Sequence, residues 1–366
     1  MALNVGIVGL PNVGKSTLFN ALTRSQNAKA ENFPFCTIEP NTAVVPVPDP
    51  RLAVLADMVH PQNVIHATVE FVDIAGLVKG ASKGEGLGNK FLGNVRDANA
   101  ILEDVRCFEN PDVTHVEGSV DPVRDVSIIE TELLLADLEA LETRLARIGK
   151  LARADPKARP EAEILEKLKA HLEGGAPVRT FPERDDEALA AALRECRFLT
   201  DKKIVYVANV DEAGIAEDNA LAAALRAHAA AAGCECVRIC AAVEQDMAGL
   251  SDSERAEFLS SYGIAESGLD IIAATCYRTL GLASFLTAGP KEVRAWTFRR
   301  GWKAPKCAGV IHGDFERGFI RARVVRYEDF VAHGGELKCR ELGLVREEGK
   351  DYEMRDGDMV EFLFNV

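Results

Sequence analysis

Residues 9–16 have the types and the spacing that bind a nucleoside triphosphate. They read Gly-Leu-Pro-Asn-Val-Gly-Lys-Ser, which fits the pattern G-x-x-x-x-G-K-[ST]. Glycines let backbone N–H groups approach phosphate oxygens, and the N-terminus of a following helix adds a positive dipole end. Lys15 is expected to act as a catalytic residue at the β- and γ-phosphates, and the Ser16 hydroxyl to coordinate Mg²⁺. The predicted nucleotide-binding residues here are Asn12, Val13, Gly14, Lys15, Ser16 and Thr17.

A second run of residues, F-V-D-I-A-G, matches the magnesium side of such a site. Its Asp73 is expected to hold Mg²⁺ through water, and the amide of Gly76 to take part in catalysis by sensing the γ-phosphate. The glycine-rich residues 77–88 then fit either a switch segment ordered by that phosphate or a plain flexible loop. Thr37 is the third predicted metal ligand, with Thr42 as a competing candidate.

These elements resemble the translation-factor-related branch of P-loop GTPases. In many such enzymes a Gln follows the glycine of D-x-x-G and orients the attacking water. Leu77 stands at that place here, and because leucine cannot hydrogen-bond to water, hydrolysis must use another group or be slow. In some members an Asn at the position of Asn12 helps to bind a potassium ion, which makes K⁺ a candidate cofactor beside Mg²⁺.

The base-binding motif departs from the usual guanine pattern N-K-x-D. Residues 209–212 read Asn-Val-Asp-Glu after a predicted strand, and the extra methylene of Glu212 displaces the carboxylate that would pair with guanine. Adenine presents an amino donor and an N7 acceptor, which an Asn side chain can pair. We therefore expect ATP in preference to GTP, unless this turn lies remote from the base. The predicted base-side residues are Asn209, Val210, Glu212 and Ala241.

Short β-branched runs alternate with helical patterns around these motifs. Strands are expected at 3–8, 68–74, 204–210 and 236–240, and a helix at 16–24. This alternation predicts an α/β fold, a P-loop NTPase domain with a mostly parallel sheet. A further central strand is expected near 100–107, although the adjacent acids Glu103 and Asp104 are costly to bury unless paired. Either that strand ends early or the acids have a partner.

Two regions differ from this alternation. Apolar residues between 134 and 148 are spaced by four and three alternately, which is a coiled-coil seam, and leucines resume the pattern at 165–172. This predicts an antiparallel helical hairpin at 126–199, inserted into a nucleotide domain of residues 1–125 and 200–280; two ordinary surface helices are the alternative. Strand periodicity after residue 281 predicts a small β-rich domain at 281–366.

The composition is that of an ordinary globular protein. The chain has 366 residues, 47% hydrophobic and 27% charged, with a net charge of −14, which argues against nucleic-acid binding by bulk charge. Nine cysteines without a C-x-x-C pair fit a reducing compartment. No basic, signal-like start and no long apolar run is present. We expect a cytoplasmic, monomeric protein with no membrane partner.

The acidic average hides a basic window. Residues 291–326 carry ten Lys or Arg against three acidic residues, with five interleaved Phe and Trp. Cations contact phosphates and aromatic rings stack on unpaired bases, so this window predicts an RNA-facing surface. A solvated sheet face with aromatic core residues behind it is the alternative.

Five motifs together resemble the YchF family of Obg-related ATPases: GLPNVGKS at 9–16, NFPFCTIEPN at 32–41, DIAGLVKGA at 73–81, NVDE at 209–212 and FLTAGPKEVRAW at 285–296. The resemblance covers the whole chain. It implies a nucleotide domain interrupted by a coiled-coil hairpin and followed by a ubiquitin-like TGS domain. It also implies ATP hydrolysis and association with the ribosome, notably its large subunit. The family's proposed catalytic histidine, on a mobile loop, matches His115; an exposed loop residue is the alternative for this position.

These observations favour a slow ATPase switch that works on or near ribosomes. An Obg-like GTPase built from the same parts is one alternative. An RNA- or ribosome-binding module, in which nucleotide regulates and turnover is incidental, is the other.

Overall fold

The computed structural model describes residues 3–28, 41–74 and 87–365. The chain divides into two units, each with its own sheet. Residues 1–21, 39–43 and 70–268 form the first unit, and residues 22–38, 44–69 and 269–366 form the second. Among the described residues, no helix has the length and apolar character needed to span a membrane.

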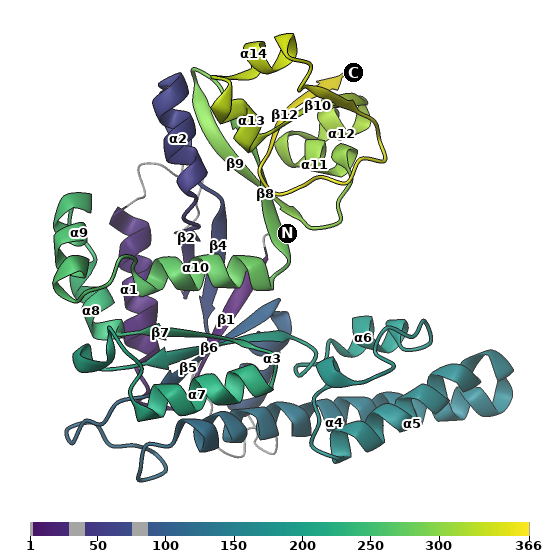
Figure 1. Cartoon of the computed structure of the whole chain (residues 1–366). Coiled ribbons are helices and arrows are strands. Elements are labelled where there is room, and N and C mark those ends of the chain that lie inside the picture. Colours follow the sequence, from purple (N-terminus) through teal and green to yellow (C-terminus); the bar gives the residue numbers. More distant parts are fainter. Residues whose placement is uncertain (1–2, 29–40, 75–86, 366) are drawn as a thin grey trace. The chain divides into compact units, whose positions relative to one another are not determined.

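The first unit is built on a six-stranded sheet (Figure 1). Its strands are β1 (Asn4–Val8), β2 (Thr42–Pro46), β4 (Thr68–Asp73), β5 (Ala100–Arg106), β6 (Lys203–Asn209) and β7 (Glu235–Ile239). Their order is β2-β4-β1-β5-β6-β7, and β1 pairs in parallel with β4 and β5, as do β5 with β6 and β6 with β7. The predicted α/β fold with a mostly parallel sheet is confirmed. Because parallel strands end at one edge, the loops that follow β1, β4, β6 and β7 share that edge.

Helices connect these strands, and the predicted elements lie within two residues of the observed strand ends. The helices are α1 (Lys15–Ala28), α3 (Leu87–Asp97), α4 (Pro122–Ala154), α5 (Arg159–Glu173), α6 (Ala190–Cys196), α7 (Ala220–Ala231), α8 (Ala241–Met247) and α9 (Asp252–Ser261). The helix expected at 16–24 is the first part of α1. Local pattern alone was therefore sufficient to place the elements nearest the motifs.

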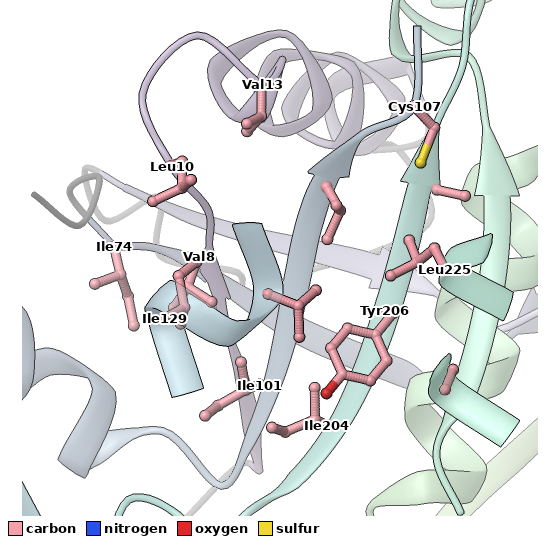
Figure 2. Close-up of a cluster of buried hydrophobic side chains, with 14 of the residues drawn as sticks. Val8, Leu10, Val13, Ile74, Ile101, Cys107, Ile129, Ile204, Tyr206 and Leu225 are labelled. Atoms are coloured by element: carbon pink, nitrogen blue, oxygen red, sulfur yellow. The ribbon is translucent and has the colours of Figure 1, made fainter. Parts of the chain in front are cut away.

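Apolar side chains from the central strands and from α4 form the core beside the candidate site (Figure 2). Val8, Ile101 and Tyr206 come from three neighbouring strands, and none of them exposes any surface. Ile129 of α4 belongs to the same cluster. Since each fully buried side chain of this kind contributes about 1.5–3 kcal/mol, this core holds the strand ends rigidly and fixes the loops that leave them.

The helical hairpin has a core of its own. α4 and α5 lie side by side (Figure 1), and Leu141, Ile148, Leu165 and Leu168 are buried between them and the segment that follows. Two ordinary surface helices, the alternative, would not form this separate cluster. The first half of α4 is different, because Val126, Ile129 and Leu133 pack into the sheet core instead. The 33-residue helix thus contributes side chains to both cores. The predicted start of the insertion, residue 126, lies in the half of α4 that packs on the sheet.

The second unit contains another six-stranded sheet, in the order β11-β10-β12-β8-β9-β3. Its strands are β3 (Asn63–Ile65), β8 (Leu282–Ala288), β9 (Glu292–Arg299), β10 (Phe319–Arg326), β11 (Arg346–Glu348) and β12 (Asp358–Phe364). Its helices are α2 (Pro50–Val59), α10 (Gly268–Thr279), α11 (Ala304–Ile311), α12 (Gly313–Arg317), α13 (Tyr327–Ala332) and α14 (Glu336–Glu341). The strand-rich segment begins at Leu282, one residue past the predicted boundary.

One strand of this second sheet comes from the N-terminal third of the chain. Residues 63–65, which the predicted boundaries place in the nucleotide domain, pair in parallel with residues 292–294 of β9. A three-residue strand contains too few alternations to reveal its partner from sequence, and the pairing is distant along the chain. The domain boundary in this region therefore differs from the expected one.

The two adjacent acids of β5, Glu103 and Asp104, match neither of the two expectations for them. The strand does not end early, because β5 continues to Arg106 and all seven of its residues are buried. Glu103 and Asp104 each expose only 1% of their surface. No oxygen of either carboxyl group has a hydrogen bond of ordinary geometry in the described structure. Burial raises the pKa of both groups well above the ordinary range.

The C-terminal end of α3 is held by a lysine from the loop before β6. Lys202 donates to the carbonyl oxygens of Ala98 and of Arg96, the latter at 3.1 Å. Burial lowers the pKa of Lys202 to about 8. Between that pH and the ordinary value near 10.5, the unfolded chain binds the extra proton, so the free energy of unfolding rises with pH.

We predict that the melting temperature of the unaltered protein, relative to that of Lys202→Met, increases from pH 8 to pH 10. The expected gain in the free energy of unfolding is about 1–2 kcal/mol, because partial exposure of the ammonium group screens the effect. The exposed neighbour Lys203, changed to Met, is the control and should show a smaller slope. If the difference in melting temperature between the unaltered protein and Lys202→Met does not change from pH 8 to pH 10, the lowered pKa of Lys202 is contradicted.

Candidate nucleotide-binding site

The P-loop joins β1 to α1, and its two glycines are required by contact. Gly14 has φ +114°, and a Cβ atom there would lie 2.1 Å from the side-chain nitrogen of Asn209. A Cβ atom at Gly9 would lie 2.8 Å from the carbonyl oxygen of Asp104. Asn12 also adopts a left-handed conformation, with φ 64°. The loop therefore lies directly on β5 and β6, with room for backbone only.

Lys15 and Asp73 meet at the carboxyl edge of the sheet. The Lys15 ammonium forms an ion pair with the Asp73 carboxylate, and Ser16 next to it in α1 is exposed. β1 and β4 are neighbours with Ile7 opposite Asp73, which explains why residues 58 positions apart are in contact. The lysine of the P-loop and the carboxylate of the second motif are thus in contact, and Ser16 follows the lysine in the chain. Thr37 and Gly76, together with Leu77, lie outside the described residues.

Asn209 links the two halves of the site. Its side-chain Nδ2 donates to the carbonyl oxygen of Val13 at 2.9 Å, and its Oδ1 accepts from the backbone N–H of Ala241 at 3.2 Å. Only 3% of the residue is exposed. One amide therefore ties the P-loop to the loop after β7 and fixes the two loops relative to each other.

The remaining base-side residues occupy different surroundings. Val210 is buried in the sheet core, so its side chain packs against protein and only its backbone faces the edge of the sheet. Glu212 is exposed in a short 3₁₀ turn, and its carboxylate accepts a hydrogen bond of 3.4 Å from the Tyr262 hydroxyl. Ala241 begins α8. The structure brings Asn209 and Ala241 together and leaves Glu212 at the rim.

His115 is buried, so the exposed-residue alternative is wrong. Its Nε2 lies 2.8 Å from a carboxylate oxygen of Asp125, and its Nδ1 accepts from the backbone N–H of Glu117 at 3.1 Å. Arg124 pairs with the other oxygen of Asp125 at 2.8 Å. Because Nδ1 accepts, Nε2 carries the proton and donates it to Asp125. Both ring nitrogens are therefore engaged, and neither is free to accept a proton from water in this conformation.

The loop that carries His115 is anchored by a residue that the sequence analysis missed. Arg106, at the end of β5, is 1% exposed and donates to the carbonyl oxygens of Phe108, Asn110 and Val113 at 3.0–3.2 Å. Asn12 of the P-loop donates to the carbonyl oxygen of Thr114 at 3.2 Å. The only available signal was an arginine at the end of a buried strand. These bonds tie the loop that carries His115 to the end of β5 and to the P-loop.

A buried acid, Asp104, lies beside the P-loop. Its carboxyl group lies under the P-loop, with Oδ2 3.7 Å from the point where a Gly14 Cβ atom would be. Burial raises the pKa of Asp104, while the charge of Lys15 and the amide of Asn209 act in the opposite direction. The Asp104 carboxyl group and the Lys15 ammonium group therefore influence one another beneath the P-loop.

The basic window of the C-terminal unit is largely neutralised by acids outside it. Arg321 pairs with Glu347, Arg323 with Glu361, Lys303 with Asp351 and Arg326 with Asp329. Counting charges within residues 291–326 missed these partners because they lie further along the chain. Four exposed cations of the window have no ion pair in the described structure, namely Lys291, Arg299, Arg300 and Lys306, and the Lys306 ammonium lies over the Trp302 ring at 4.2 Å.

The aromatic residues of that window are occupied as well. Phe298 and Phe319 are core residues, and Trp296, Trp302 and Phe315 pack against the same cluster. The Trp296 ring is also covered by the Arg294 guanidinium at 3.7 Å. The alternative of a sheet with aromatic core residues therefore describes this window, and base stacking on these rings does not.

Comparison with known proteins agrees with this architecture. A model described as 50S ribosome-binding GTPase matches residues 4–134, and a model of the YchF GTPase C-terminal domain, described as of unknown function, matches residues 282–365. A curated relative from Bacillus subtilis, Ribosome-binding ATPase YchF, is 50% identical over 369 residues and matches from end to end. The Escherichia coli O157:H7 relative of the same name is 52% identical over 367 residues, again covering both chains fully.

The chain belongs to the YchF family. The solved structure of the Schizosaccharomyces pombe YchF GTPase superposes with a TM-score of 0.88 at 36% identity, covering 99% of this chain and 97% of that one. A GTP-binding protein from Pyrococcus horikoshii, with a TM-score of 0.61 at 20% identity, shares the fold alone. The family accounts for the P-loop sheet and the C-terminal domain in one chain.

We predict that Arg106→Met loosens the His115 loop of this YchF protein. Three carbonyl oxygens lose their buried donor, so amide hydrogen exchange in residues 107–117 should speed up by about tenfold or more. Arg238→Met is the matched control, because Arg238 also donates to a loop carbonyl, that of Ala216, but far along the chain. Exchange in 107–117 that is equally slow in both variants would refute the anchoring role of Arg106.

Proposed function

We propose that this chain hydrolyses ATP as a switch protein associated with the ribosome. Relatives that match it from end to end are named ribosome-binding ATPases. The observation that carries the proposal is the Asn209 bridge, because it joins a P-loop to a base-side loop through one side chain. Lys15 and Asp73 lie at the same edge of the sheet, where phosphates and a divalent cation bind in such folds.

ATP is the proposed substrate in preference to GTP. A glutamate stands in place of the aspartate that pairs with guanine, and Glu212 lies exposed at the rim. The Asn209 oxygen, which faces the Ala241 loop, keeps a second lone pair that can accept from an adenine amino group. Guanine presents a carbonyl oxygen at the corresponding position, which would face that same lone pair.

Mg²⁺ is the proposed cofactor, held by Ser16 and Asp73 together with the phosphates and with Thr37. The donor set fits, because hydroxyl and carboxylate oxygens are the ligands of this cation, and it keeps several waters when it binds with phosphates. Within the described residues no cluster of three or more His, Cys, Asp or Glu is placed to hold a metal. Asn12 beside the P-loop is the proposed contact for K⁺.

Hydrolysis is proposed to be slow until the His115 loop rearranges. Leu77 replaces the usual water-orienting glutamine, and both nitrogens of His115 are engaged by Asp125 and Glu117. A catalytic role for His115 therefore requires opening of that pair. Lys15 and the Gly76 amide then offset charge that develops on the phosphates.

We place the ribosome contact, on the large subunit and through RNA, on the C-terminal unit, which we identify as the TGS domain of residues 281–366. Arg299 and Arg300 support this contact because they are exposed, adjacent and without an ion pair among the described residues. The protein is proposed to act as a cytoplasmic monomer. An RNA-binding module regulated by nucleotide without turnover is the remaining alternative.

Calorimetric titration tests the base preference. ATP is expected to bind the unaltered protein at least about tenfold more tightly than GTP, a difference of roughly 1.4 kcal/mol. Lys15→Ala should lose affinity for both nucleotides, whereas the exposed hairpin residue Lys150, changed to Ala, should lose none. GTP binding that is tenfold tighter than ATP binding would reverse the proposed preference and favour an Obg-like GTPase.

Co-sedimentation with ribosomes tests the binding surface. We expect Arg299→Glu together with Arg300→Glu to weaken pelleting by about tenfold or more, because phosphate contacts are lost and repulsion is introduced. Lys338→Glu with Arg340→Glu reverses two exposed cations of the same unit that already pair with Glu341 and Glu336, and should pellet normally. Lys15→Ala should also pellet. Equal pelleting of both double variants would exclude the Arg299–Arg300 surface.

A further inference from the structure

The acid Asp104 lies at the joint between the P-loop and the base-side loop. It is in the middle of β5, opposite Val207 of β6, and its Cβ atom and carbonyl oxygen lie within 3.6 Å of the position of a Gly9 Cβ atom. Its Oδ2 lies 3.7 Å from the corresponding position on Gly14, and the Nδ2 of Asn209 lies 2.1 Å from that same position. The Asp104 carboxyl group and the nitrogen of the Asn209 side chain therefore face the same point of the P-loop.

The surroundings of Asn209 distinguish the two ends of its amide. The nitrogen end meets an acceptor, the carbonyl oxygen of Val13, and the oxygen end meets a donor, the N–H of Ala241. An asparagine amide has two N–H donors, so one remains beside the Asp104 carboxyl group. With Asp104 present, a flipped amide would turn its oxygen toward two acceptors at once.

We propose that Asp104 is a positioning residue that sets base specificity by fixing the orientation of the Asn209 amide. With the nitrogen held toward Val13 and Asp104, the oxygen faces the Ala241 side, where it accepts from the amino group of adenine and repels the carbonyl oxygen of guanine. Asp104 acts through Asn209 and does not touch the nucleotide. This inference rests on the proposed function, because it concerns the same base site.

The neighbouring acid on β5 provides a matched control. Glu103 faces the opposite side of the sheet, where Glu130 and Arg179 act on its pKa and Tyr206 donates to Glu130 at 3.0 Å. Glu103 has the same burial and the same lack of hydrogen bonds. Removing either acid also removes the cost of burying its carboxyl group, so the loss of stability is expected to be small.

The test is calorimetric titration of Asp104→Leu, Asp104→Asn and Glu103→Leu with ADP, GDP and inorganic tripolyphosphate. Leucine keeps the branching of aspartate but removes the acceptor, whereas asparagine retains one acceptor oxygen. Asp104→Leu should lower the ratio of ADP to GDP affinity by about tenfold, while tripolyphosphate affinity stays within about threefold. Asp104→Asn and Glu103→Leu should keep the ratio of the unaltered protein.

If the unaltered protein prefers ADP and Asp104→Leu keeps the same ratio of ADP to GDP affinity, the positioning role of Asp104 is overturned, while the proposed base preference stands. A parallel loss of tripolyphosphate, ADP and GDP affinity would also overturn that role, because Asp104 would then only support the P-loop. An unaltered protein that binds GDP more tightly than ADP would overturn the proposed base preference, and this positioning role with it. Melting temperatures of all three variants identify any loss that comes from unfolding.

Discussion

The hydrogen bonds of the Asn209 side chain are the constraint on which the rest of the candidate site depends. They join the carbonyl oxygen of Val13 to the N–H of Ala241, two loops that leave different strands of the sheet. The bridge exists only because Gly14 has no Cβ atom, which would lie 2.1 Å from the Asn209 nitrogen. A single absent side chain therefore allows the phosphate and base elements to share one rigid edge.

The strand β5, which lies beside this bridge, buries two carboxyl groups, and their burial lowers the stability of the fold. Two adjacent acids, Glu103 and Asp104, are buried on opposite faces of a central strand, and burial raises the pKa of both. A buried carboxyl group without an ordinary hydrogen bond is costly even when neutral. The position of Asp104 next to Asn209 supplies a physical reason for that cost at one of the two residues, whereas the structure explains no such benefit for Glu103.

The sequence was sufficient to predict the elements that depend on contacts between residues close together in the chain. The P-loop pattern, the β-branched runs and the alternating spacing of four and three residues predicted β1, α1 and the α4–α5 hairpin, because each depends on neighbouring residues. The pairing of residues 63–65 with β9 depends on contacts more than two hundred positions away, and a short strand gives no sign of them. The first half of α4 also packs on the sheet, which an uninterrupted helical pattern does not reveal.

The candidate site was predictable to a similar degree. Of the motif residues, Lys15 pairs with Asp73, and Asn209 bonds to Val13 of the P-loop; their roles toward a nucleotide stay predictions. The anchoring by Arg106, the burial of His115 against Asp125 and the ion pairs of Arg321 and Arg323 were not predictable, because each partner is chosen by the folded chain. A charge count over a window cannot show a carboxylate that arrives from another strand.

Lys15 forms an ion pair with Asp73, so a bound phosphate would compete with this carboxylate for the lysine. A structure of the protein with Mg²⁺ and a non-hydrolysable ATP analogue is the most direct measurement. We expect Lys15 to contact the phosphates, Asn209 to remain bonded to Val13 and Ala241, and its oxygen to face the adenine amino group. An Asn209 side chain turned away from Val13, or a Lys15 still paired with Asp73 beside bound nucleotide, would contradict this view of the site.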